Sequence, residues 1–184
     1  MSSILVLSGS PSATSRTAAL SDHLADRLRA HGHAVGAVRV RDLPPEPLAH
    51  AHAADPVIAE VVGAIAAADG LVVASPVYKA AYSGLLKLLL DLLPQFALAG
   101  KVVLPVVTGG TTAHVLAIDY ALRPVLSSLG AGHIVPGWFV LDQHIEPAPD
   151  GLRLDPATAT ELYRVVDGFS AALGRPLVAA SSTA

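Results

Sequence analysis

Cysteine is absent from the 184 residues, which excludes disulfide bonds, thiolate catalysis and cysteine-ligated metal sites. Charged residues make up only 15%, and the formal net charge of −3 comes without a basic patch, so neither nucleic acid nor an anionic membrane is an expected partner. No uncharged apolar run approaches the length that spans a bilayer, and the N-terminus lacks a signal-peptide pattern. A cytoplasmic enzyme or binding protein is therefore the default expectation.

Apolar residues, by contrast, are plentiful and account for 52% of the chain. This length favours one domain, which we place at 1–175, followed by a flexible C-terminal tail at 176–184. So high an apolar content indicates that another subunit covers part of the surface. We therefore expect a homo-oligomer, either a dimer or a tetramer.

Short apolar runs alternate along the chain with segments of helical length. The five runs expected to form strands are 4–7, 34–40, 71–75, 102–107 and 134–141, the last interrupted near Pro136 and Gly137. The five expected helices are 18–30, 56–68, 81–93, 112–129 and 157–173. A proline-rich surface excursion precedes the second helix. The alternation predicts an α/β fold in which helices cover both faces of a parallel sheet.

The turn after the first expected strand is rich in hydroxyl groups. Six serines and threonines lie between Ser8 and Thr17, together with the forked cation of Arg16. The helix that follows leaves its first amide N–H groups unpaired, and such a helix end stabilises an anion. The turn lacks the later glycines of a dinucleotide site and the Gly-Lys-Ser/Thr of a P-loop. It therefore favours another kind of phosphate, the alternative being a helix capped by Thr14 or Ser15 without a ligand.

Ligands of such sheets bind beyond the carboxyl ends of the strands, where the strand order reverses. Three short polar loops are expected at that edge, and they read SGSPSATSR, SPVYKAAYSG and TGGTTAH. Together they would enclose a flat, partly apolar ring with a phosphate tail, a description that fits flavin mononucleotide (FMN). The alternative for Tyr78 is an ordinary half-buried aromatic, and the alternative for Gly109 and Gly110 is a simple turn.

Four segments resemble the NAD(P)H-dependent FMN reductases of the alkanesulfonate-utilisation type, between about residues 4 and 134. They read LSGSPSATSR, ADGLVVASPVYKAAYSGLLKLLLDLLP, LAGKVVLPVVTGGTTAH and IDYALRPVLSSLGA. The resemblance implies a flavodoxin-like, doubly wound five-stranded parallel sheet in the order 2-1-3-4-5. It also implies an enzyme that reduces FMN with NADPH or NADH and passes the reduced FMN to a flavin-dependent monooxygenase. Hydride transfer to flavin N5 is the chemistry of the cofactor, so no catalytic acid or base is expected.

The resemblance further implies which residues bind the cofactor. The FMN phosphate is expected at Ser10, Ser15, Arg16 and Thr17, the ring edge and ribityl chain at Pro76, Val77 and Tyr78, and the pyrimidine side at Thr108, Gly109 and Gly110. Some family members carry arginine directly after GSP, where this chain has Ser12, so one phosphate or nucleotide contact is missing. The preference for NADPH or NADH is thereby left open. Lys79 is either a cofactor-phosphate contact or a solvated loop lysine.

Two helical segments indicate contacts between subunits. Pro124 cannot donate to the carbonyl of Tyr120, so the helix should kink or widen there. In the resembled reductases the matching tyrosine belongs to a π-helical insertion at a subunit interface, whereas the alternative is a plain kink with Tyr120 in the core. Leucines surround the segment 81–93. Because the sheet can cover only one side of it, we expect another subunit on the other side.

A metal site is not expected, because the closely spaced histidine pairs at 31 and 33 and at 50 and 52 lack a convincing carboxylate cluster. Two other functions compete with the flavin reductase. A flavoenzyme that retains FMN would reduce quinones, azo compounds or metal ions, and the ASPVYKAAYSG and TGGT resemblance disfavours it. An electron carrier like flavodoxin is disfavoured because flavodoxins are very acidic and enclose the ring between aromatics, whereas this chain has a charge of −3 and only eight aromatic residues.

Overall fold

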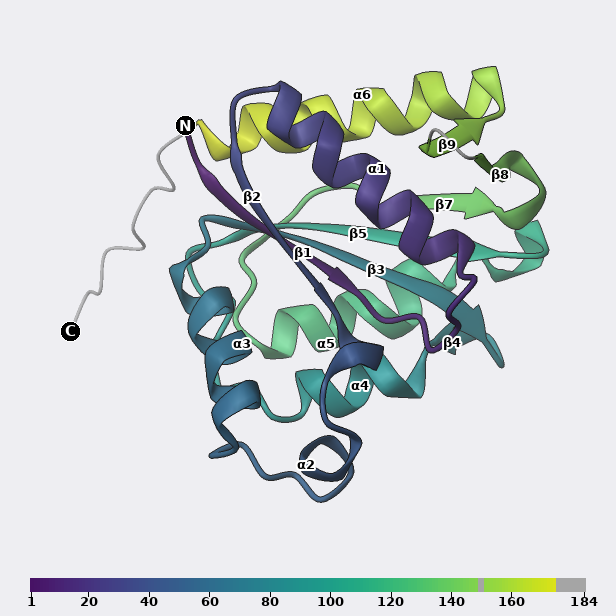
Figure 1. Ribbon diagram of the computed structural model, residues 1–184. Helices are drawn as coiled ribbons and strands as arrows, with labels where there is room; N and C mark the ends of the chain where they lie inside the picture. The colour runs from purple at the N-terminus through teal and green to yellow at the C-terminus, as the bar shows by residue number, and fades with distance from the viewer. Residues whose placement is uncertain (149–150, 175–184) are drawn as a thin grey trace.

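A parallel sheet lies between two layers of helices in the computed structural model, which describes residues 1–148 and 151–174 (Figure 1). One face is covered by α1 (Arg16–Ala30) and α6 (Pro156–Leu173). The other face is covered by α3 (Pro56–Ala67), α4 (Gly84–Leu90) and α5 (Arg123–Ser128). The predicted α/β fold is confirmed, while the predicted tail at 176–184 lies outside the described residues.

The sheet runs in the order β2-β1-β3-β5-β6, with β7 also beside β5 and β4 beside β3. Its parallel strands are β1 (Ser3–Ser8), β2 (Ala34–Arg39), β3 (Gly70–Tyr78), β5 (Val102–Gly109), β6 (His133–Ile134) and β7 (Trp138–Leu141). The predicted order 2-1-3-4-5 is confirmed, because β5 is the predicted fourth strand and β6 and β7 together are the fifth. The prediction lacked the antiparallel β4 (Ala81–Tyr82) and a separate hairpin of β8 (Ile145–Ala148) and β9 (Gly151–Leu154).

The fifth predicted strand is split, as expected, near Pro136 and Gly137. A Cβ atom at Gly137 would lie 2.7 Å from the carbonyl oxygen of Pro105 and 2.9 Å from Cγ2 of Ile118. Only glycine lets the chain pass this close to β5. The regular strand pairing ends at Ile134 before this close approach and resumes at Trp138 after it.

The leucine-rich segment forms a shorter helix than predicted. Residues 81–82 belong to β4, so α4 begins at Gly84 after its N-cap Ser83. The proline-rich excursion folds into η1 (Val40–Asp42) and α2 (Pro45–Ala49), and both contact α4. The leucines of the leucine-rich segment are consequently buried within one chain, apart from Leu85, which is partly buried, and Leu88, which is exposed. The side of α4 away from the sheet, where another subunit was expected, is covered in part by η1 and α2 of the same chain.

The predicted disturbance around Pro124 is a π-helix. The segment that was expected to be one helix forms η2 (Thr112–His114), the π-helical η3 (Ile118–Leu122) and then α5. The amide of Arg123 donates to the carbonyl of Ile118, five residues earlier. Tyr120 is 80% exposed, so the alternative that places it in the core is wrong. Its role at an interface stays a prediction.

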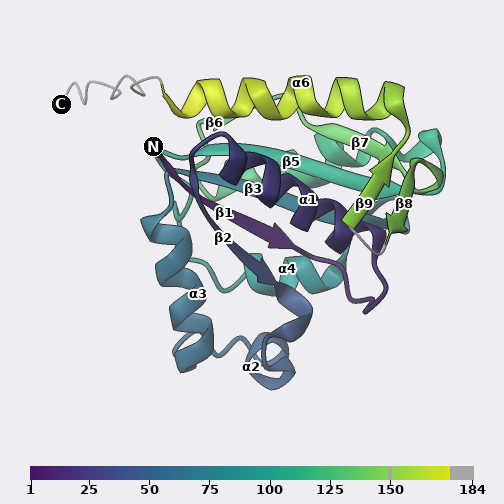
Figure 2. The ribbon, with the colours of Figure 1, turned by 45° about the horizontal axis from the view of Figure 1, so that its top comes forward.

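Helices α1 and α6 lie on the same face of the sheet (Figures 1 and 2), and a cluster of polar side chains joins them. Nε2 of His23 and the hydroxyl of Tyr163 lie 2.7 Å apart. The Arg27 guanidinium lies 4.1 Å from the Tyr163 ring centre and 2.9 Å from the Asp167 carboxylate. Burial lowers the pKa of His23 below its ordinary 6.5, an effect that Asp26 opposes and Arg27 reinforces.

We expect this cluster to make the protein less stable as the pH falls below about 6.5. The lowered pKa means that the unfolded chain binds a proton on His23 more readily than the folded chain. The stabilisation is fully present above the ordinary pKa and declines as the pH falls towards the lowered one. The variant His23→Gln keeps polar atoms near Tyr163 but does not titrate. Its urea midpoint should fall less than the wild-type midpoint between about pH 7.5 and 5.5, and equal falls would contradict the assignment.

None of the helices in the part of the chain that the structure describes is both long and apolar enough to cross a membrane. Within 1–148 and 151–174, no three histidine, aspartate or glutamate side chains gather around a point that could hold a metal ion.

Candidate functional site

The carboxyl ends of β1, β3 and β5 bring the three polar loops to one edge of the sheet (Figure 1). In the strand register, Ser8 lies beside Ala74 and Pro76 lies beside Thr108. The chain goes from β1 outward to β2, and then crosses back to β3 on the other side of β1. The strand order therefore reverses at β1, and the loops meet where ligands of such sheets bind.

Loop 1, defined as residues 9–15, leads from β1 to the N-terminus of α1. Ser15 caps the helix, because its Oγ accepts a hydrogen bond of 3.1 Å from the amide of Ala18. The amides of Arg16 and Thr17 have no acceptor within the helix and carry its partial positive charge. The predicted cap at Ser15 is confirmed, while the binding of an anion at this helix end stays a prediction.

The predicted phosphate contacts differ in their surroundings. Ser10 is buried, and its Oγ accepts a hydrogen bond from the amide of Ser12 at 3.3 Å. Arg16 is exposed, and its Nε donates to the carbonyl oxygen of Ile145 in β8 at 3.3 Å. That bond leaves both terminal nitrogens of the guanidinium for other partners.

Thr17 and Thr108 lie beneath the surface of the site. Their hydroxyl oxygens are 2.7 Å apart, and both residues are buried. This hydrogen bond holds the start of α1 against the end of β5. The structure therefore brings these two predicted residues together, and their contact with FMN stays a prediction.

Ser8 has a buried hydroxyl for which the described residues provide no hydrogen-bond partner. Side chains alternate along a strand, and Ile4 and Val6 face the layer of α1, so Ser8 faces the same layer. Its Oγ therefore lies on the face of the sheet that α1 covers, where loop 1 begins. A buried polar group of this kind calls for a ligand or water to complete it.

The loop after β3 is a β-hairpin. Val77 pairs with Tyr82 and Tyr78 pairs with Ala81, so Pro76 and Val77 have the predicted extended backbone. At the tip, Lys79 and Ala80 adopt φ angles of 51° and 64°. Two residues with positive φ form the turn that twisted hairpins prefer, but asparagine and glycine are its usual residues. Such strained backbone collects at ligand sites, and Tyr78, which is 48% exposed, stands beside it.

Ser83 joins loop 1, β3 and α4, although it is not among the predicted site residues. It is buried, and its Oγ accepts from the amide of Leu86, which caps α4. The same hydroxyl donates to the carbonyl oxygen of Gly9 in loop 1. The amide of Ser83 donates to Oγ of Ser75 at 2.9 Å. A serine before an apolar helix indicates a cap, but no local signal indicates the bond to loop 1.

The two glycines predicted to approach the ring have different surroundings. Gly109 is buried, and a Cβ atom there would lie 3.0 Å from Cζ of Phe139. Gly110 is exposed, and a Cβ atom there would meet nothing within 4 Å. Open space therefore lies at Gly110, while Gly109 packs closely against Phe139. The contact of both glycines with FMN stays a prediction.

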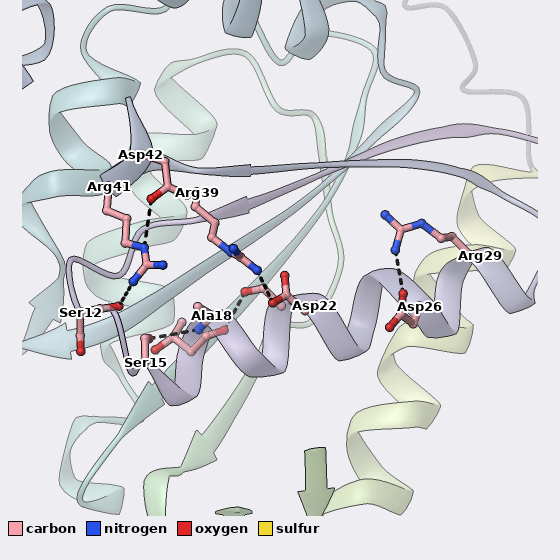
Figure 3. Close-up of polar contacts among 11 residues, drawn as sticks. Ser12, Ser15, Ala18, Asp22, Asp26, Arg29, Arg39, Arg41 and Asp42 are labelled. Carbon is pink, nitrogen blue, oxygen red and sulfur yellow. Dashed lines mark hydrogen bonds and ion pairs between the residues drawn. The ribbon is translucent and has the colours of Figure 1, made fainter. Parts of the chain in front are cut away.

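Arg41 reaches loop 1 from η1, directly beyond the end of β2 (Figure 3). Its Nη1 donates to the carbonyl oxygen of Ser12 at 2.6 Å, and its Nε lies 3.3 Å from the Asp42 carboxylate. Two residues earlier, Arg39 pairs with Asp22 of α1 at 2.6 Å. An arginine at the end of a strand has no sequence signature that would have marked it.

Known proteins resemble this chain over nearly its whole length. The family model described as NADPH-dependent FMN reductase matches residues 2–146. An FMN reductase (NADPH) of Escherichia coli K12 is 44% identical over 177 residues, which cover 94% of this chain and 90% of the relative. The NADH-dependent FMN reductase SfnF of Pseudomonas putida is 35% identical over 183 residues, which cover 97% and 96%.

A solved structure extends the similarity to three dimensions. The apo form of the NADH:FMN oxidoreductase EMOB superposes with a TM-score of 0.87 at 42% identity, covering 96% of this chain and 92% of that chain. The match agrees with the flavodoxin-like arrangement described above. The chain therefore belongs to the family of NADPH-dependent FMN reductases.

Proposed function

We propose that this enzyme reduces FMN with NADPH or NADH and releases the reduced FMN to a flavin-dependent monooxygenase. One observation carries the proposal: the three loops that resemble those of FMN reductases meet at the strand-order reversal of a chain that belongs to this family. The resemblance to reductases of alkanesulfonate utilisation supports the monooxygenase as the acceptor. Relatives named for NADPH and for NADH both match, and the proposal therefore includes both coenzymes.

The residues at this edge fit FMN. The free amides of α1, the hydroxyl groups of Ser10 and Ser15 and the cation of Arg16 together form a donor set suited to a phosphate. The unpartnered hydroxyl of Ser8 adds a buried group that a ligand or water would complete. The open space at Gly110 suits a flat ring.

Bound FMN supplies the redox chemistry by accepting a hydride at N5. The contribution of the protein is to keep the three loops of the site at fixed distances from one another. Ser83 ties loop 1 to the start of α4, and through Ser75 to the end of β3. The bond between Thr17 and Thr108 holds the third loop in the same way. No side chain has to transfer a proton for the hydride to move.

The test is the oxidation of NADPH and NADH by the purified protein, with and without added FMN, after its visible spectrum is recorded. We expect a colourless protein whose turnover requires free FMN and saturates with it. A yellow protein that reduces quinones without added FMN would contradict the release of reduced flavin. Failure to oxidise either coenzyme would contradict the enzymatic function.

We also infer that the chain forms a dimer or tetramer through the apolar surface around η3. Tyr120 is 80% exposed and Leu116 is 57% exposed, and Val115 is exposed beside them. Exposed apolar groups concentrated on one segment are typical of protein contacts. Sedimentation at micromolar concentration should give an oligomer that Tyr120→Asp weakens without altering the far-UV circular dichroism spectrum. A wild-type monomer would contradict the inference.

A further inference from the structure

We propose that Arg41 is a second cation of the phosphate site, which holds loop 1 in its anion-binding conformation and adds positive charge beside it. The inference rests on the proposed function, because it assigns one more residue to the binding of the same FMN phosphate. Arg41 acts through the loop and is therefore a positioning residue.

The first support is the way in which Arg41 fixes the backbone of loop 1. Its Nη1 donates a hydrogen bond of 2.6 Å to the carbonyl oxygen of Ser12 (Figure 3). The amide of the same residue donates to Oγ of Ser10 at 3.3 Å. Ser12 is thus held on both sides of its Cα atom. A charged donor makes the stronger kind of hydrogen bond, so Arg41 restricts the path by which the loop reaches the helix end.

The second support is the balance of charge around the loop. No acidic residue lies between Ser8 and Ser21, and the first one in α1, Asp22, already pairs with Arg39. The carboxylate beside Arg41 belongs to Asp42, whose side chain is 60% exposed, so water screens this carboxylate more than it screens the guanidinium. The Arg41 side chain is only 22% exposed, so water screens its charge incompletely. Positive charge therefore remains available to an anion in loop 1.

The third support is the position at which the guanidinium acts. Arg41 belongs to η1, beyond the end of β2, yet it contacts the backbone of loop 1 at Ser12. Ser12 lies three residues before Ser15, the N-cap of α1. The cation is thus held close in sequence to the helix end at which the phosphate is proposed to bind.

The experiment compares Arg41→Gln with the matched control Arg39→Gln, which removes an arginine two residues away that pairs with α1. Dissociation constants for FMN and for riboflavin are measured by flavin fluorescence, together with kcat and KM. Because riboflavin lacks the phosphate, Arg41→Gln should weaken FMN binding about tenfold and riboflavin binding less than about twofold. The loss should appear chiefly in the KM for FMN, which should rise by a larger factor than kcat falls. Arg39→Gln should leave both affinities within about twofold of wild type.

Two further variants secure the interpretation. Ser12→Arg in the Arg41→Gln background should recover most of the FMN affinity, because it returns a guanidinium to the loop. Arg41→Lys keeps the charge but loses the planar guanidinium with its several N–H donors. Its FMN affinity should lie between those of wild type and Arg41→Gln, and it replaces Arg41→Gln if that variant does not fold.

Three results would overturn the assignment. The first is an FMN affinity of Arg41→Gln equal to that of wild type, and the second is an equal loss of affinity for FMN and riboflavin. The third is a rise in the KM for NADPH without a rise in the KM for NADH or a loss of FMN affinity, which would mean that Arg41 binds the coenzyme. If wild type binds FMN but oxidises neither coenzyme, the proposed function fails while the flavin-binding comparison still decides the role of Arg41.

Discussion

Replacing Gly9 by alanine is expected to lower the free energy of unfolding by about 1–3 kcal/mol. A Cβ atom at this position would lie 2.6 Å from Cβ of Leu86 and 3.2 Å from Oγ of Ser83. Both neighbours are buried, and a Cβ atom attached to the backbone of α4 cannot rotate out of the way. Loop 1 or the helix would have to move. Urea unfolding monitored by circular dichroism measures the loss.

Gly110→Ala is the matched control, because a Cβ atom there meets nothing within 4 Å. Its stability should stay within about 0.5 kcal/mol of wild type. The two variants should also differ in flavin binding. Gly9→Ala should lower the affinity for FMN because it displaces loop 1, whereas Gly110→Ala should lower it only by filling space that the ring would use. A Gly9→Ala protein as stable as wild type would show that the close packing against Leu86 does not hold in solution.

Ser83→Ala should lower the free energy of unfolding by about 2–3 kcal/mol, since one hydroxyl makes two structural contacts. Its loss removes the cap of α4 and leaves the carbonyl oxygen of Gly9 without its donor in a buried setting. The first effect costs about 1 kcal/mol and the second about 1–3 kcal/mol, and they do not add fully because they share one atom. The measurement is again urea unfolding, with the KM for FMN determined at a temperature where the variant is folded.

Two controls accompany Ser83→Ala. Ser83→Thr keeps the hydroxyl and should retain more stability than the alanine variant. Ser128→Ala removes an exposed hydroxyl that donates to the carbonyl of Val125 within its own helix, and it should change stability by less than about 0.5 kcal/mol. If Ser83→Ala and Ser128→Ala lowered the free energy of unfolding equally, the hydrogen bond between loop 1 and α4 would not stabilise the protein.

Much of the fold was predictable because its signals are local. Continuous apolar runs marked the strands, and helical periodicity marked the helices between them. The missing N–H of Pro124 marked the place where the π-helix forms. The rule for strand-order reversals then placed the three loops at one edge.

The missed features depend on contacts or on unusual backbone. The hairpin at Lys79 and Ala80 lacks the asparagine or glycine that normally indicates such a turn, so a helix was predicted from residue 81, which belongs to β4. The covering of α4 by η1 and α2 was missed because nothing in a leucine-rich helix says which distant segment will pack on it.

By itself, the sequence determined the alternation of elements, a cap at Thr14 or Ser15 and a kink or widening near Pro124, since each depends on residues within a turn or two of one another. Only the tertiary structure decided that Arg41 holds a carbonyl 29 positions away, that Ser83 holds one 74 positions away, and that Thr17 bonds across 91 positions to Thr108. Serine, threonine and arginine can all serve many partners. Which distant group each one meets is settled only when the sheet and its helices pack.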